Sequence, residues 1–192
     1  MSTNTSLSAP RARRPARWLL LPALIGVLVA LTVGLLARAE ASAPGTYPGG
    51  YFRLFFSDPL HLKVWFATAA LAVALLQPFS GAWMFGKLPW RRPRWLAPAH
   101  RWTGLIVFLL TLPVAYHCIF RIGFRTTSDR VTTHAVLGCL LYGAFAAKVL
   151  IVRLRRFPSW AFVVAGGALF ALLVAVWYTS ALWLLRAAGV AL

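Results

Sequence analysis

The sequence predicts an all-α integral membrane protein whose five transmembrane helices form a bundle. The chain has 192 residues, of which 60% are hydrophobic and only 12% are charged, whereas soluble domains carry about 25% charged residues. Five apolar windows each reach the roughly 20 residues that a helix needs to cross the hydrocarbon core of a bilayer. None of them alternates with a period of two, so β-strand spans are not expected.

The first predicted span covers residues 18–37 and contains no charged residue. Residues 1–17 before it form a basic tail that we expect on the cytoplasmic side. A basic stretch before an apolar segment also begins a signal peptide, but this segment is longer than the 7–15 residues of a signal-peptide core. We therefore expect a retained helix, with residues 18–192 forming one transmembrane domain.

The second and third predicted spans cover residues 59–80 and 102–120. The second is apolar after Lys63, and its start has the pattern of an N-cap, Asp58, followed by proline at the first helical position. The third is apolar apart from His117. Prolines and glycines between residues 78 and 98 are predicted to separate the two spans.

The fourth predicted span covers residues 131–152 and has His134 and Lys148 as its only ionisable side chains. The fifth covers residues 158–185 and has none. The connecting loops are too short for a core of their own, so no separate soluble domain is expected.

The charges predict the orientation. There are 20 Lys and Arg residues against 3 Asp and Glu, a formal net charge of +17. The basic residues concentrate in the tail, in the second-to-third loop and in the fourth-to-fifth loop, which the positive-inside rule places in the cytoplasm. We therefore expect a multi-pass protein of the cell (inner, cytoplasmic) membrane, with its N-terminus cytoplasmic and its C-terminus outside. The basic clusters suit anionic membrane lipid, and no nucleic-acid role is expected, because no soluble scaffold displays them.

Four histidines are the best candidate ligands. His61, His117 and His134 fall at the outer ends of three consecutive spans, whereas His100 opens the third span at its cytoplasmic end. Ionisable groups in spans are costly and mark candidate functional sites, although a histidine at an interface can also simply meet water and headgroups. Neutral imidazole is a common ligand of haem iron and zinc. The outer trio therefore predicts a cofactor site at that depth.

Haem b suits the surroundings of the trio, because it needs imidazole ligands, small residues beside the ring and cations for its propionates. His117 and His134 are the preferred iron ligands, since a short loop joins their spans, and His61 is the alternative. The other expected haem contacts are Tyr116, Gly138, Arg121, Arg125 and Arg130.

The histidine pattern also resembles a known class of proteins. The run from His100 to Gly104, the run from Pro113 to Cys118 and the later His134 resemble the histidine-bearing helices of transmembrane b-type cytochromes, namely the ascorbate-reducible cytochromes and the ferric reductases. The resemblance covers Ala99–Val152 and implies haem-based electron transfer. Those cytochromes carry two haems, whereas three outer histidines and one inner histidine allow at most one bis-histidine haem here. The whole chain also resembles a five-helix actinobacterial membrane protein family of unassigned function.

The expected function is a membrane electron-transfer subunit, and thus an oxidoreductase subunit, with one outer-facing haem b. Its redox partner would be an extracytoplasmic protein on the outer side or a quinol. No catalytic residue is assigned. Two alternatives stay open: a cofactor-free scaffold or assembly subunit of a larger membrane complex, and a three-histidine zinc or copper site. An inner quinone site at His100 and Arg101 would be compatible with the haem.

Overall fold

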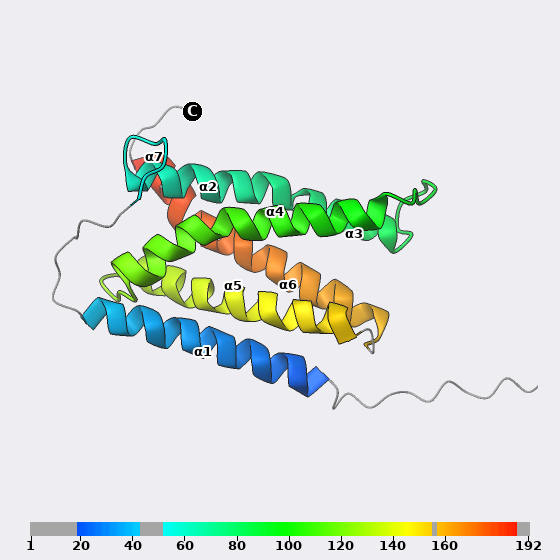
Figure 1. The fold of residues 1–192 in the computed structure, drawn as a ribbon, viewed down its shortest axis with the longest axis horizontal. Coiled ribbons are helices and arrows are strands. Elements are labelled where there is room, and N and C mark those ends of the chain that lie inside the picture. Colours follow the sequence, from blue (N-terminus) through cyan, green and yellow to red (C-terminus); the bar gives the residue numbers. More distant parts are fainter. Residues whose placement is uncertain (1–18, 43–51, 155–156, 188–192) are drawn as a thin grey trace, which may run out of the picture.

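The computed structural model describes residues 19–42, 52–154 and 157–187, and within these ranges the chain is helical throughout its elements (Figure 1). Five helices are long and apolar enough to cross a membrane. They run alternately up and down as a bundle, which confirms the predicted all-α, five-span fold class.

Most spans are longer than the apolar windows that predicted them, and three are divided into segments. In chain order the elements are α1 (Leu20–Ser42), α2 (Pro59–Ala74), α3 (Leu76–Met84), α4 (Leu96–Tyr116), the π-helical η2 (His117–Ile122), α5 (Asp129–Leu154), α6 (Ser159–Trp177), the π-helical η3 (Tyr178–Leu182) and α7 (Trp183–Ala187). The extra turns arise because hydropathy marks the part of a helix in lipid, while backbone hydrogen bonding continues into the interface.

Two prolines expected to separate the second and third spans lie inside helices instead. Pro78 has no N–H, and its ring would clash with the carbonyl of Ala74, four residues earlier. The helix accordingly breaks at Leu75, between α2 and α3, and then continues to Met84. Pro98 lies in the first turn of α4, where its missing N–H interrupts no hydrogen bond. The loop between the spans is therefore confined to residues 85–95.

The helices pack in two groups. The first group is α2, α3 and α4, and the second is α1, α5 and α6. The groups meet where α6 contacts α2 and α3 and where α1 contacts η2, which continues the α4 span. Among the described helices, α4 and α5 are not in close backbone contact. Long side chains bridge them instead: the rings of Phe108 and Phe145 stack with centroids 4.2 Å apart, and the Tyr142 hydroxyl donates to Thr111 Oγ1 at 3.2 Å.

Glycines close the seam between α1 and α5. A Cβ added at Gly143 would lie 2.4 Å from the carbonyl oxygen of Gly26, and one added at Gly26 would lie 2.9 Å from the carbonyl oxygen of Gly143. Small residues of this kind let membrane helices approach until their backbones touch. The first span is therefore held to the bundle by a contact that no larger residue can replace.

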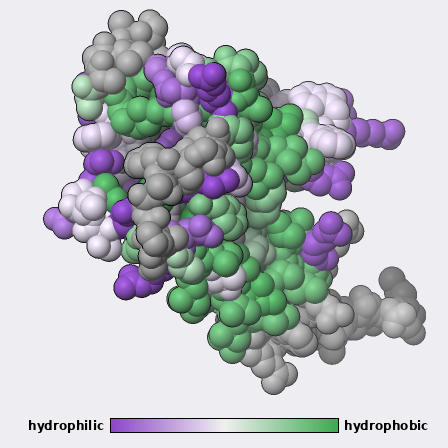
Figure 2. All heavy atoms as spheres, turned by 60° about the vertical axis from the view of Figure 1, so that its left-hand side comes forward, coloured by the Kyte–Doolittle hydropathy of each residue, from purple (hydrophilic) through white to green (hydrophobic). Residues whose placement is uncertain are grey.

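Apolar side chains cover the outside of the bundle. Leu24, Leu28 and Leu35 of α1 and Val164 of α6 are each more than half exposed. Figure 2 shows a broad apolar flank, with hydrophilic side chains gathered toward its ends. Exposed apolar surface on this scale suits contact with lipid and supports a multi-pass membrane protein.

Asp58 caps α2, as the sequence predicts. One carboxylate oxygen, Oδ1, accepts hydrogen bonds from the backbone N–H groups of Leu60 at 2.7 Å and His61 at 2.9 Å. The other oxygen is bonded to the His61 imidazole. The backbone N–H of His61 is the main cause that lowers the pKa of Asp58 to about 2, from an ordinary value of 3.8.

Replacing Asp58 by alanine is expected to destabilise the protein by about 1 kcal/mol, because two N–H groups of the first turn lose their acceptor. Asp58→Asn keeps an acceptor and should lose less. Since the folded pKa is the lower one, the stabilisation from the carboxylate is complete above pH 3.8 and disappears as the pH approaches 2. Thermal unfolding in detergent, followed by circular dichroism at pH 5 and near pH 2, checks both points, because the difference between wild type and Asp58→Ala should be present at pH 5 and should vanish near pH 2. A larger loss for asparagine than for alanine would contradict the capping role.

Candidate functional site

Two cavities lie between α4 and α5, one after the other along the bundle. One cavity, at the end where α5 begins, contains His134 in its wall and has a volume of about 320 Å³. The other, at the end where α4 begins, contains His100 and has a volume of about 390 Å³. We name them the outer and the inner cavity after the orientation that the sequence predicts. Thr111, Tyr142 and two leucines line both cavities and form a partition between them. Both volumes fall in the range of small-molecule sites.

His134 is held in a defined orientation at the outer cavity. Its Nδ1 lies 3.1 Å from Thr179 Oγ1. The Thr179 hydroxyl lies within hydrogen-bonding distance of two backbone carbonyl oxygens, Ala175 O at 2.9 Å and Val176 O at 3.1 Å, and a hydroxyl that donates to either of them can accept the hydrogen of His134 Nδ1. Neutral imidazole then carries its lone pair on Nε2. A metal-ligating histidine has this arrangement, with the other ring nitrogen donating to a fixed oxygen.

The outer cavity has room beside His134. A Cβ added at Gly138, one helical turn along α5, would meet no atom within 4 Å. Two π-helical segments also border the cavity: η2 contributes Cys118 and Ile119, and η3 contributes Ser180. Such segments are rare and frequently occur at functional sites.

Three cations stand among the mainly apolar walls of the outer cavity, namely Lys63, Arg125 and Arg130. The Arg130 guanidinium lies 3.7 Å from the ring centroid of Trp183, and its Nη1 donates to the carbonyl oxygen of Thr179 at 2.8 Å. None of the three acids of the chain, Glu40, Asp58 and Asp129, lines the cavity. The cavity therefore suits an apolar ligand that carries negative charge.

His117 belongs to a different environment. It is 0% exposed, and its Nδ1–H donates to the carbonyl oxygen of Pro113 at 2.7 Å. Its ring packs against Phe52, which lies in the segment before α2, with centroids 4.6 Å apart. Beside it, the Tyr116 hydroxyl accepts a hydrogen bond from Arg121 Nη2 at 2.8 Å. We call Phe52, Tyr116, His117 and Arg121 the His117 cluster; none of its residues lines the outer cavity.

His61 is in a third environment. It is exposed at the start of α2 and is bonded to Asp58. The structure therefore brings His134, Gly138, Arg125 and Arg130 together, but it places His61 and the His117 cluster elsewhere. Within the described ranges, no three His, Cys, Asp or Glu side chains gather closely enough to hold a metal ion. This arrangement does not assemble the three-histidine zinc or copper alternative.

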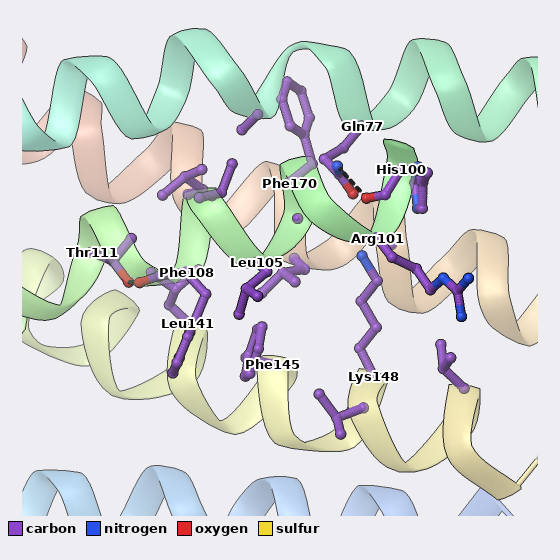
Figure 3. A pocket seen from close by; sticks show the side chains of 18 of the residues that line it. Gln77, His100, Arg101, Leu105, Phe108, Thr111, Leu141, Phe145, Lys148 and Phe170 are labelled. Carbon is purple, nitrogen blue, oxygen red and sulfur yellow. Dashed lines mark hydrogen bonds between the residues drawn. The ribbon is translucent and has the colours of Figure 1, made fainter. Parts of the chain in front are cut away.

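The inner cavity also combines apolar walls with cations. His100 Nδ1 lies 2.7 Å from Ser80 Oγ, and the Gln77 amide donates to the His100 carbonyl oxygen at 3.0 Å. Arg101 and Lys148 line the same cavity, and Figure 3 shows the Lys148 side chain extending into it from α5. Both residues of the predicted inner pair, His100 and Arg101, thus line this cavity, and Lys148 lines it with them.

Lys148 and Thr179 line or support these cavities, although the sequence assigned neither of them a role. The sequence does contain an indication of Lys148, because it is the only lysine or arginine within residues 131–152. It also follows His134 by 14 residues, which is almost four helical turns. That spacing puts both side chains on similar faces of α5. The sequence contains no such indication of Thr179, since a hydroxyl group in an apolar helix usually forms a hydrogen bond with the backbone of its own helix.

Comparison with known proteins identifies the family but no activity. No curated protein and no solved structure matches the chain. A family model matches residues 19–192, which include all five spans. The chain belongs to DUF6529, a family of unknown function.

Proposed function

We propose that the protein is a membrane electron-transfer subunit that binds one haem b in the outer cavity, with His134 as an axial ligand. The observation that carries the proposal is the orientation of this imidazole. Its Nδ1 lies 3.1 Å from Thr179 Oγ1, and in the tautomer that donates this hydrogen to Thr179 the lone pair on Nε2 is available at the wall of a mainly apolar cavity.

The residues of the outer cavity fit the requirements of haem b. Gly138 leaves space next to the ligand, and the walls are mainly apolar. Lys63, Arg125 and Arg130 supply positive charge for the two propionates. When bound, haem supplies a one-electron couple. The contribution of the chain is to bind the iron through imidazole, to exclude water and to tune the potential through burial and charge.

The second axial ligand distinguishes two versions of this proposal. His117 lies outside the outer cavity, in the His117 cluster, so ligation by His134 alone agrees best with the geometry. Ligation by both His117 and His134 would require His117 to leave Phe52 and turn toward the cavity. Its Nδ1–H bond to Pro113 is the kind that orients ligating histidines. The His117→Ala variant separates the versions, because it loses haem only in the second.

Electron exchange with an extracytoplasmic redox protein or a quinol completes the proposal. The distribution of basic residues supports a cytoplasmic N-terminus, which puts the outer cavity near the outer face of the cell membrane. Aromatic residues lie at the same end, including Phe55, which is 83% exposed. The resemblance of residues 99–152 to b-type cytochromes supports the same class of activity.

A visible spectrum tests the proposed function. The protein is expressed with added haem, purified in detergent, and measured as a dithionite-reduced minus oxidised difference. We expect roughly one haem per chain, with a broad high-spin spectrum for ligation by His134 alone and a sharp b-type α-band for ligation by both His117 and His134. The haem signal should be lost in His134→Ala and retained in His100→Ala, whose imidazole lies in the inner cavity. A haem-free preparation would refute the proposal and favour a cofactor-free scaffold. Equal haem content in both variants would refute it as well, because the haem would then bind without His134.

A further inference from the structure

We infer that the inner cavity binds one acidic phospholipid, with an acyl chain between α4, α5 and α6 and its phosphate at Lys148. The inference concerns a different cavity from the haem proposal and does not depend on it. It rests on the shape of the apolar part, on the charges beside it and on the position of every acid in the chain.

The apolar part of the cavity has the form of a slot between helices. Leu105 of α4, Phe145 of α5 and Phe170 of α6 form walls on three sides (Figure 3). Gly166 of α6 also lines the slot, and a Cβ added there would meet no atom within 4 Å. A flexible acyl chain can follow such a slot, because it loses little by adapting to an irregular apolar wall.

Basic side chains line the cavity beside this slot, and no acidic side chain of the chain lines it. Lys148 extends into the cavity from α5, and Arg101 and Arg153 line it as well. The chain has 3 acids, and all of them lie in the described ranges at the opposite end of the bundle, beside the start of α2 or α5 or the end of α1. No acid of this chain can therefore pair with Lys148 inside the bundle.

An anionic ligand would compensate the positive charge of Lys148. A lysine in a membrane interior is unfavourable unless it finds a partner or water. Phosphate is a good partner, since lysine binds it as a point charge and arginine binds it through two parallel hydrogen bonds. Basic pockets between transmembrane helices recognise acidic lipid headgroups in this way.

The surrounding charge favours phospholipid over a neutral quinone. The loop at the same end carries four further cations, Lys87, Arg91, Arg92 and Arg94. A quinone head would accept hydrogen bonds but would leave the positive charge of the cavity uncompensated. An acidic phospholipid compensates this charge, and the adjacent bilayer supplies it directly.

Native mass spectrometry of the full chain in detergent tests the inference. The protein is equilibrated with equal amounts of phosphatidylglycerol and phosphatidylcholine. We expect one phosphatidylglycerol to be retained per chain, with a preference of about tenfold over phosphatidylcholine. Lys148→Met, which removes the charge but keeps an unbranched side chain, should reduce that retention about tenfold. Lys87→Met is the matched control, because Lys87 is exposed at the same end and does not line the cavity.

A second pair of variants tests the slot without changing charge. Gly166→Leu should fill the slot and expel the acyl chain. Gly167→Leu, at the next residue, also meets nothing within 4 Å but does not line the cavity, so it should retain the lipid. Equal retention of the two lipids, or equal behaviour within either pair of variants, would overturn the inference. So would a retained molecule with the mass of a quinone that disappears in His100→Ala. Haem content measured on the same samples should stay unchanged, so failure here is distinguishable from failure of the haem proposal.

Discussion

Replacing Gly143 by alanine is expected to destabilise the protein by about 2 kcal/mol, because the new methyl group would collide with the backbone of α1. The added Cβ would lie 2.4 Å from the carbonyl oxygen of Gly26 and 2.9 Å from the Cβ of Ala30. Neither atom belongs to a flexible side chain, so α1 and α5 must move apart. For a chain of this length, we expect a decrease of roughly 4–8 °C in Tm, measured by thermal unfolding in detergent.

Gly34→Ala is the matched control on the same seam. A Cβ at Gly34 would lie 3.6 Å from Cys139 Sγ, which is an ordinary van der Waals contact. Alanine also favours helix more than glycine does. The control should therefore unfold at or slightly above the wild-type temperature. If the two alanine variants unfold at the same temperature, the close contact of Gly26 with Gly143 is not what holds α1 in place.

Gly138→Leu is expected to abolish haem binding while the fold is retained. The leucine side chain would occupy the open space beside His134, and no existing atom within 4 Å opposes its Cβ. The iron ligand remains in place, so the variant tests where the haem binds rather than what coordinates it. We expect more than a tenfold decrease in the haem-to-protein ratio, read from the reduced minus oxidised spectrum.

Gly167→Leu serves as the control for this substitution as well. Gly167 lies on the exposed surface of α6 and lines neither cavity, although leucine there also has open space. Haem should remain at the wild-type level. A normal haem signal in Gly138→Leu would mean that any haem binds outside the outer cavity. Circular dichroism of both variants confirms that a loss of haem is not a loss of helix.

The fold could be predicted from the sequence because the bilayer imposes a length on each apolar helix. Five windows of sufficient length leave few alternatives, and all five are helices. The details at the helix ends could not be predicted in the same way. Pro78 interrupts a span without ending it, since neighbouring helices and the continuing lipid environment keep the following residues helical.

The sequence indicates the end of the bundle at which each candidate residue lies, but it does not indicate the face of the helix on which the side chain lies. The sequence predicts that His134, Gly138, Arg125 and Arg130 lie near one another, because a helix start and the adjacent loop must lie close together, and all four line the outer cavity. It could not show that Cys118 faces the outer cavity while His117 faces Phe52. Consecutive residues differ by about 100° around a helix, and spans that are apolar on every side give no clue to which face points inward.

The neighbouring pairs of helices in this bundle differ in how closely their backbones approach. The helices α4 and α5 meet through side chains, whereas α1 and α5 meet through backbone at Gly26 and Gly143. Side chains can be added at Gly138 of α5 or Gly166 of α6, which line the two cavities, without meeting backbone, whereas a single methyl group at the contact of α1 with α5 forces two helices apart. Whether a glycine in this protein can be replaced by a larger residue therefore depends on which helices it lies between. It depends less on how apolar its surroundings are.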